Sequence, residues 1–121
     1  MPAALRYRNG LGGIVAGNDA VITGDTALGN HGAGIETLNA CTIRNNVTNS
    51  NADHGIHTQT GSNVSENAAR SNTLMGLSSN SFSVGYRNNV FGNNNGGNAN
   101  PQVASATDLG GNLCGTSPDC P

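Results

Sequence analysis

The sequence has no tryptophan and no lysine, and it holds only two phenylalanines, two tyrosines and four prolines among 121 residues. Charged residues make up 10% of the chain, and its five basic residues are all arginine. Nucleic-acid binding needs a basic patch with aromatic side chains, so the composition predicts no nucleic-acid partner. The formal net charge of −2 is too small to predict disorder driven by charge. The scarcity of strong helix formers excludes a helical bundle.

Long hydrophobic runs are missing as well. No stretch approaches 18 consecutive apolar residues, so we expect no membrane span. The first six residues, Met-Pro-Ala-Ala-Leu-Arg, lack the apolar segment of a signal peptide. We therefore expect no signal peptide in this chain; an exported protein would have lost it, or the chain would be a piece of a longer one. The length predicts one domain.

Asparagine and glycine are present in excess. There are 20 Asn and 18 Gly, and with 10 Ser and 10 Thr they make 58 of the 121 residues. Collagen is excluded because glycine does not recur at every third position. The glycines instead mark a longer repeat, since Gly-Ile or Gly-Leu pairs begin at positions spaced by 21, namely Gly13, Gly34, Gly55 and Gly76.

Three further columns of residues keep this spacing, with one inserted residue in the fourth unit. The first is apolar and consists of Ile22, Ile43, Val64 and Tyr86. The second is polar and consists of Asp25, Asn46, Asn67 and Asn89. The third is Asn30, Asn51, Asn72 and Asn94. Agreement of independent columns across four units establishes a 21-residue repeat.

Within a unit, apolar and polar residues alternate over very short stretches, as in residues 35–37 and 41–43. Such alternation is typical of half-buried strands. One unit holds three short strands and cannot bury its apolar face alone, whereas units stacked about 4.8 Å apart can. The sequence thus predicts an all-β parallel β-helix, or solenoid, of about four to five turns with 21 residues per turn. We expect a partial turn or cap in residues 1–12, the turns in 13–97 and a C-terminal cap in 98–121.

The repeat assigns the abundant residue types to places in this fold. Stacked asparagines at a corner can hydrogen-bond along the stack, and asparagine tolerates the left-handed backbone conformation of tight corners. Glycine is expected at the remaining corners. The narrow interior admits small and β-branched residues, as in the column of Ala20, Cys41 and Ser62.

These features resemble the right-handed parallel β-helix, or pectate-lyase-like, proteins. The matching pieces are the Gly-Ile starts, the Ile-Arg-Asn-Asn-Val block at 43–47, the Tyr-Arg-Asn-Asn-Val block at 86–90 and the ending at 109–121, which is similar to the C-terminal part of uncharacterised bacterial members. The resemblance covers residues 11–121. It implies a right-handed helix and an extracellular or periplasmic location. Members of this fold include polysaccharide lyases, polygalacturonases, epimerases, phage tailspikes and passive surface proteins. The fold alone therefore does not indicate which activity a member has.

The three cysteines have different expected roles. Cys41 lies in the inward column of small residues, which favours a buried hydrophobic side chain over a nucleophile. Cys114 and Cys120 enclose a turn-rich stretch and are candidates for a disulfide. One disulfide would indicate an oxidising compartment.

Glu36 and His57 form the strongest candidate for chemistry. Both stand two places after the repeat glycine, where the side chain points outward, so they should lie on adjacent turns about 4.8 Å apart. A carboxylate beside an imidazole is suited to general acid–base catalysis, and neighbouring outward columns add Gln59 and Thr42 as ligand-binding candidates. The same pair also fits an ordinary exposed cross-strand contact.

A second cluster, His31, Asp53 and His54, precedes the repeat glycine and is a weak candidate for a metal site of imidazole and carboxylate groups. The three residues do not share one column, so solvated turn residues are the alternative. Lyases of the family that the chain resembles typically hold calcium with several acidic residues, and glycosidases need two facing carboxylates. Neither arrangement is evident, and we expect no cofactor.

The ends of a solenoid are open sheet edges over an apolar core. We expect the stretch after Pro101, with Val103, Leu109 and Leu113, to fold across the C-terminal end. At the other end, Tyr7-Arg8-Asn9-Gly10-Leu11 is similar to residues 86–90, which suggests that the chain enters in mid-turn and that the next unit follows after a shortening at residues 12–13. The less protected N-terminal end predicts self-association into a homodimer joined end to end.

Three functions remain open at this point. The first is a non-catalytic structural or carbohydrate-binding solenoid, either whole or a fragment of an exported protein, with a polysaccharide as its partner. The second is a polysaccharide-active enzyme, a lyase, hydrolase or epimerase, that uses the Glu36 and His57 face. The third is ice binding, which needs a regular row of threonines on one face of the solenoid. Here the row formed by Thr37 and Thr58 is interrupted by Ala16 and Ser79 in the neighbouring turns. We favour the first, so an enzyme is less expected than a binding or structural protein.

Overall fold

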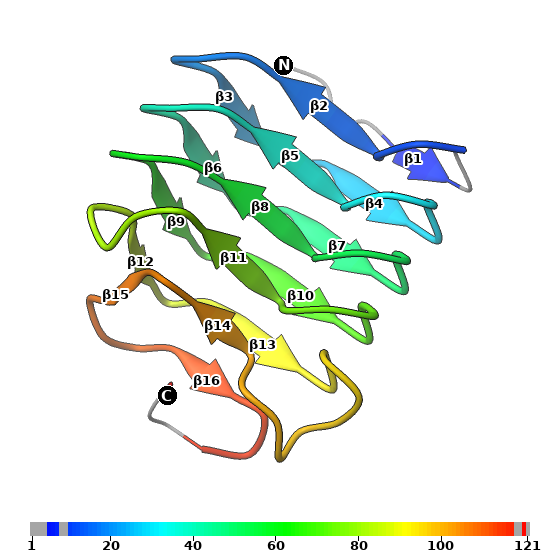
Figure 1. Cartoon of the computed structure of the whole chain (residues 1–121), viewed down its shortest axis with the longest axis vertical. Helices are drawn as coiled ribbons and strands as arrows, with labels where there is room; N and C mark the ends of the chain where they lie inside the picture. The colour runs from blue at the N-terminus through cyan, green and yellow to red at the C-terminus, as the bar shows by residue number, and fades with distance from the viewer. Residues whose placement is uncertain (1–4, 8–9, 118–119, 121) are drawn as a thin grey trace.

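Sixteen short strands form three parallel sheets in a computed structural model that describes residues 5–7, 10–117 and 120 (Figure 1). Sheet A contains β1 (Leu5–Tyr7), β4 (Thr26–Leu28), β7 (Val47–Asn49), β10 (Ala68–Arg70), β13 (Val90–Gly92) and β16 (Leu113–Cys114). Sheet B contains β2 (Ile14–Ala16), β5 (Ile35–Thr37), β8 (Ile56–Thr58), β11 (Leu77–Ser79) and β14 (Val103–Ala104). Sheet C contains β3 (Val21–Thr23), β6 (Thr42–Arg44), β9 (Asn63–Ser65), β12 (Gly85–Arg87) and β15 (Thr107–Asp108).

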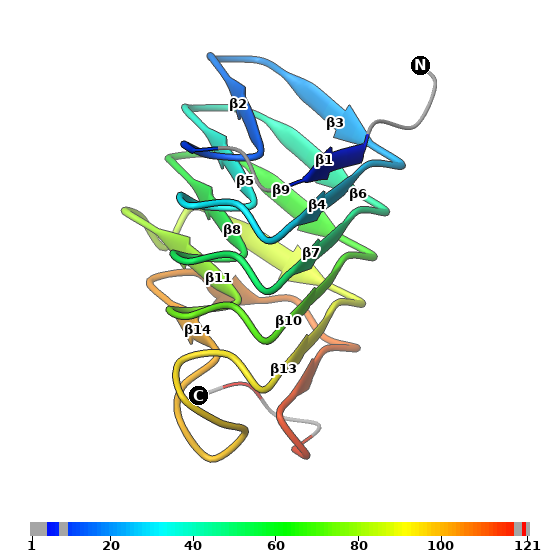
Figure 2. The ribbon, with the colours of Figure 1, turned by 90° about the vertical axis from the view of Figure 1, so that its right-hand side faces the viewer.

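The chain passes through sheets B, C and A in turn, and each strand lies beside its equivalent in the next turn (Figures 1 and 2). Ile14 pairs with Ile35 and Ile35 with Ile56, which is the 21-residue spacing read from the sequence. The inserted residue appears where Tyr86 pairs with Val64. The predicted all-β parallel solenoid of about five turns, with about 21 residues per turn, is confirmed. The described residues contain no helix that is long and apolar enough to cross a membrane.

The N-terminal strand keeps the 21-residue spacing, contrary to our expectation. β1 pairs with β4 in sheet A, and Tyr7 lies opposite Leu28. The likeness of residues 7–11 to residues 86–90 would have placed Tyr7 in sheet C, with a shortened turn after it. That alignment is wrong because hydrogen bonding along the stack fixes the register, and a local match of five residues does not. Arg8 and Asn9 lie outside the described residues.

The core is a narrow column of stacked side chains. Ile35, Ile56 and Leu77 are fully buried on sheet B, and Ile43 and Val64 are fully buried on sheet C. Strand residues between these positions face outward, as the alternation predicted. The core of the last turns holds larger side chains than expected. Two aromatic rings, Tyr86 and Phe91, take positions that smaller residues hold in earlier turns, and they pack edge to face with centroids 6.0 Å apart.

Some interior positions are polar and hydrogen-bonded. The hydroxyl oxygens of Thr37 and Thr58 lie 2.7 Å apart, and the Thr58 hydroxyl donates to the Ser62 hydroxyl at 2.9 Å. Both threonines are fully buried. This threonine rank therefore faces the interior, where it cannot meet ice.

Two ladders of buried asparagine side chains run along the stack. The first consists of Asp25, Asn46, Asn67, Asn89 and Asn112. The second consists of Asn30, Asn51, Asn72, Asn94 and Gln102. Asn51 shows the pattern: its Oδ1 accepts from the backbone N and the Nδ2 of Asn30, at 3.0 and 2.9 Å. Its Nδ2 donates to Asn72 Oδ1 at 2.9 Å and to the Ala27 carbonyl at 3.1 Å. The predicted asparagine stacking is confirmed.

The ladder asparagines do not adopt the left-handed conformation that we expected of them. Positive φ falls on the residue before each one, such as Asn45 at 60° before Asn46 and Ser50 at 55° before Asn51. The preceding residue makes the corner and stays exposed, which turns the ladder side chain inward. Inside, its amide satisfies backbone groups that the corner would otherwise leave unpaired.

The C-terminal segment continues the solenoid. β14, β15 and β16 pair with β11, β12 and β13, so this segment adds a further turn to all three sheets. Val103 is buried, but Leu109 and Leu113 are 52% and 40% exposed. Leu109 and Leu113 therefore do not cover the core, contrary to our expectation, whereas Val103 packs into it. The longer connection of residues 93–102 lies at this end of the molecule (Figure 1).

Candidate functional site

A shallow pocket of about 330 Å³ lies on the outer side of sheet B, where strands β5 and β8 lie side by side. Its lining consists of Ala33, Glu36, Asp53, His54, His57 and Leu74. Three repeat columns supply these residues from successive turns, because positions 33 and 54, 53 and 74, and 36 and 57 each differ by 21. The small side chain of Ala33 in one turn leaves room beside the imidazole of His54 in the next.

The two imidazoles form the centre of this pocket. The rings of His54 and His57 are stacked with centroids 5.5 Å apart and an interplanar angle of 18°. His54 Nδ1 accepts a hydrogen bond from the backbone N of Met75 at 3.1 Å. Because that nitrogen accepts, the proton of the neutral ring is on Nε2.

Asp53 holds His54 from the other side. Its Oδ1 accepts from the His54 backbone N at 2.7 Å and lies 3.6 Å from His54 Nε2. Burial lowers the pKa of His54 below its ordinary value of 6.5, the Asp53 carboxylate partly offsets this, and His57 lowers it further. His54 is therefore mainly neutral at pH 7.

One polar atom of the pocket is left without a partner. His57 Nδ1 is buried and makes no hydrogen bond within the described part of the chain. Glu36 is the register partner of His57 on the adjacent strand and is exposed. A buried imidazole nitrogen with no partner is an unsatisfied polar group, which is rare in folded proteins.

The structure brings together residues that the sequence had placed in two clusters. Glu36 and His57 lie on adjacent turns as predicted, and Asp53 and His54 join them, although the described ion pair joins Asp53 to His54. Thr42 does not line the pocket because it belongs to β6 in sheet C, and Gln59 lies in the turn after β8. His31 is exposed and lies outside the lining.

No metal centre forms from the predicted cluster. Among residues 5–7, 10–117 and 120, no group of three or more His, Cys, Asp or Glu side chains is placed to hold a metal ion. His54 has its Nδ1 occupied by Met75, and its ring is stacked on His57 instead of converging with it. The expected combination of His31, Asp53 and His54 is thus not assembled.

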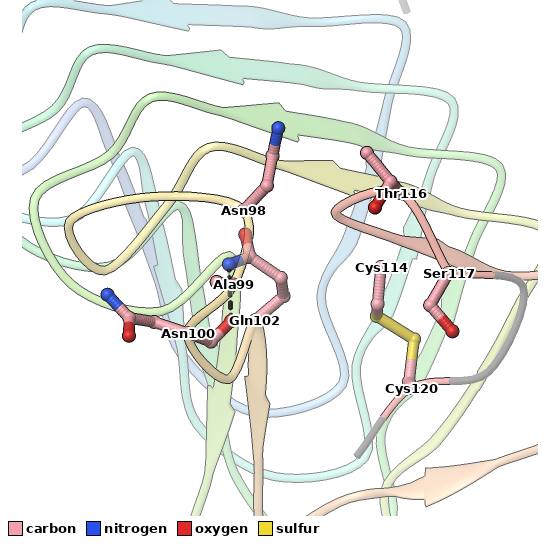
Figure 3. Close-up of a pocket in the computed structure, with 8 residues that line it drawn as sticks. All are labelled: Asn98, Ala99, Asn100, Gln102, Cys114, Thr116, Ser117 and Cys120. Atoms are coloured by element: carbon pink, nitrogen blue, oxygen red, sulfur yellow. Dashed lines mark hydrogen bonds between the residues drawn. A yellow bond between two sulfur atoms is a disulfide. The ribbon is translucent and has the colours of Figure 1, made fainter.

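A second hollow, of about 430 Å³, lies at the C-terminal end and is lined by Asn98, Ala99, Asn100, Gln102, Cys114, Thr116, Ser117 and Cys120 (Figure 3). The side-chain amides of Gln102 and Asn100 in this hollow already have partners in the fold. Gln102 Nε2 donates to the carbonyls of Asn94, Gly97 and Asn100, and Asn100 Nδ2 donates to the Asn95 carbonyl. These bonds hold the long connection in place, so this hollow is a weaker candidate for a ligand than the histidine pocket.

The cysteines fall into a buried thiol and a disulfide. Cys41 is buried, and its thiol lies 3.2 Å from the Gly17 carbonyl and 3.4 Å from the Asn39 carbonyl. Such a thiol is inaccessible as a nucleophile. The sulfurs of Cys114 and Cys120 are joined in a disulfide beside the C-terminal hollow (Figure 3).

Comparison of the chain with known protein families, with curated proteins and with solved structures found no match.

Stability should depend on pH through His54. The pKa of His54 is about 6.5 in the unfolded chain and lower in the folded protein. At a pH between these two pKa values, the unfolded chain therefore binds more protons than the folded protein does. We expect the free energy of unfolding to fall as the pH drops through 6.5 and to level off below the folded pKa. Protonation also removes the acceptor that Met75 uses. Urea denaturation between pH 8 and pH 4 measures this dependence.

The variant His54→Gln should flatten this part of the pH profile. The matched control is His31→Gln, because His31 is exposed and lies outside the pocket lining. A profile that His54→Gln leaves unchanged, or that His31→Gln flattens equally, contradicts the assignment to His54.

Proposed function

We propose that this protein is a non-catalytic β-solenoid that binds a polysaccharide on the outer face of sheet B, at the histidine pocket. The observation that carries the proposal is that one pocket gathers two imidazoles, His54 and His57, and the two carboxylates of Glu36 and Asp53. Elsewhere, most buried amides of the repeat are engaged in the ladders. The pocket is where polar groups remain for a ligand.

The charge of the pocket selects among sugars. Glu36 and Asp53 contribute carboxylates, and the lowered pKa of His54 leaves little positive charge to balance them at pH 7. The carboxylates of Glu36 and Asp53 would repel the carboxylates of a uronic-acid chain bound in the pocket, so such chains are disfavoured. Neutral sugars, and amino sugars above all, fit a site whose carboxylates accept from hydroxyl and ammonium groups.

The shape of the site suits an extended chain. Leu74 and Ala33 give the pocket an apolar part against which the C–H face of a sugar can pack, with the polar groups beside it. Adjacent turns are spaced by about 4.8 Å, close to the length of one sugar ring. A polysaccharide lying along the stack would therefore present successive sugars to successive turns.

The alternative is a polysaccharide-active enzyme on the same face. It is favoured by one observation, the neighbourhood of Glu36, His57 and His54, which supplies a carboxylate and two imidazoles. We prefer binding because Glu36 is exposed and the pocket is shallow, so little water is excluded from the reacting groups. New reducing ends or double bonds formed from a polysaccharide, and lost in Glu36→Gln, would favour the enzyme.

We further infer that the solenoid is of the right-handed, pectate-lyase-like type and acts outside the cytoplasm, in the extracellular space or the periplasm. The short repeat motifs support the type, and the Cys114–Cys120 disulfide supports the location, because such bonds persist in oxidising compartments.

The binding proposal is tested by calorimetric titration with three oligosaccharides, built from glucosamine, glucose and galacturonic acid. We expect the glucosamine oligomer to bind most tightly and the galacturonic acid oligomer not at all. His57→Ala and Glu36→Gln should each weaken binding about tenfold, which corresponds to about 1.4 kcal/mol and to the loss of one good hydrogen bond.

Gln59→Ala and Thr42→Ala are the matched controls, since both residues lie near the site in sequence but outside its lining. Equal weakening by these controls, or tightest binding of the acidic oligomer, contradicts the proposal.

A further inference from the structure

The first turn of the solenoid differs from the later turns in its outward residues. Val15 and Val21 are 67% and 63% exposed, and Leu11 in the preceding connection is 80% exposed. The same column as Val15 holds Glu36, His57 and Ser78 in later turns. The column of Val21 continues with Thr42, Asn63 and Gly85. Apolar side chains thus stand on the first turn where later turns carry polar residues or glycine.

The core is also less covered at this end. Ile14 and Ala20 are partly exposed, whereas their equivalents Ile35 and Cys41 are 0% and 1% exposed. β1, β2 and β3 are the first strands of sheets A, B and C, so each has one edge without a neighbouring strand among the described residues. Unpaired strand edges beside apolar side chains are a template for adding strands of another chain.

We infer that the N-terminal end is an interaction surface for a second copy of this chain, joined end to end about a two-fold axis. The two-fold axis passes through the middle of β2 and is perpendicular to the direction in which the turns stack. Rotation about it places β2 of one molecule antiparallel to β2 of the other. The same rotation exchanges sheets A and C, so β3 of one copy meets β1 of the other. All three edges are then paired at once, and Val15 lies directly opposite its equivalent.

The C-terminal end disfavours a head-to-tail chain of molecules. It carries the long connection of residues 93–102, which lies beside the last strands and obstructs a flat strand edge there (Figure 1). The occupant that fits the N-terminal edge is therefore the same edge of another molecule.

Sedimentation equilibrium of the whole chain tests this inference. We expect a dimer for the wild type and a monomer for Val15→Glu, since the axis brings two glutamates face to face. Val15 is 67% exposed, so the substitution leaves the core untouched. Val47→Glu is the control, because Val47 is an exposed valine in the middle of sheet A and should leave the dimer intact.

Cysteine cross-linking gives a second measurement of the geometry. Oxidised Val15→Cys should run as a covalent dimer without reductant, and Val47→Cys should not. A wild-type monomer at the highest soluble concentration, a ladder of higher oligomers, or a Val15→Glu dimer as tight as the wild type would each overturn the inference. Circular dichroism confirms that the variants compared are folded.

Discussion

Replacing Asn51 by alanine is expected to lower the free energy of unfolding by about 4 kcal/mol, because several buried hydrogen bonds are lost together. Its side chain accepts two bonds from Asn30 and donates to Asn72 and to the Ala27 carbonyl. Each buried group left without a partner costs about 1–3 kcal/mol, and the alanine methyl satisfies none of them. The loss is a large part of the roughly 5–15 kcal/mol that stabilises a typical domain.

Asn63→Thr is the matched control for this prediction. Asn63 is exposed on β9, and its register partner in the preceding turn is Thr42. Its replacement should change stability by less than about 0.5 kcal/mol. Urea denaturation followed by circular dichroism measures both variants. Equal stability of Asn51→Ala and the wild type would show that the ladder does not hold the turns together.

Replacing Gly55 by alanine is expected to destabilise the fold by about 3 kcal/mol or more, through steric overlap. A Cβ atom built on Gly55 would lie 2.7 Å from Asn72 Nδ2, 2.7 Å from Thr48 Oγ1 and 2.8 Å from the Gly76 carbonyl oxygen. Two of these atoms belong to the hydrogen-bonded stack and cannot move without breaking it. Glycine is thus required at this position because the ladder and the next turn approach closely. A left-handed backbone does not explain it, since the φ of Gly55 is not among the positive ones.

Gly17→Ala is the control for the glycine prediction. A Cβ on Gly17 would meet no atom within 4 Å, and its φ is not among the positive ones. This variant should be neutral or up to about 1 kcal/mol more stable, because alanine restricts the unfolded chain. Thermal denaturation of the two variants separates the effects. Equal melting temperatures of the Gly55→Ala and Gly17→Ala proteins would contradict the close packing around Gly55.

The fold could be predicted from the sequence because one spacing governs it. Stacked turns force equivalent residues into columns, so the difference of 21 between Gly34 and Gly55 fixes the register of all three sheets. The prediction failed where the spacing changes. Asn112 follows Asn89 by 23 residues and Gln102 follows Asn94 by eight, so neither was recognised as the last rung of its ladder.

The candidate site could be predicted only in part. The columns placed Glu36 beside His57, since both are outward on adjacent strands. They did not show that His54 stacks on His57 or that Leu74 completes the lining, because these contacts join different columns and depend on side-chain rotamers. A usable signal was present: Ala33 is small where the next turn has His54, which leaves space at that point of the stack.

We propose that the repeat uses its polar residues to build the stack and leaves the histidine pocket free to bind a sugar chain. Chemical-shift mapping by NMR during titration with glucosamine oligosaccharide separates these two roles. We predict that the shifts concentrate on the pocket residues Ala33, Glu36, Asp53, His54, His57 and Leu74. The ladder amides, such as Asn51 Nδ2, should not move. Shifts centred on the C-terminal hollow at residues 98–102, or no saturable shifts at all, would contradict this proposal.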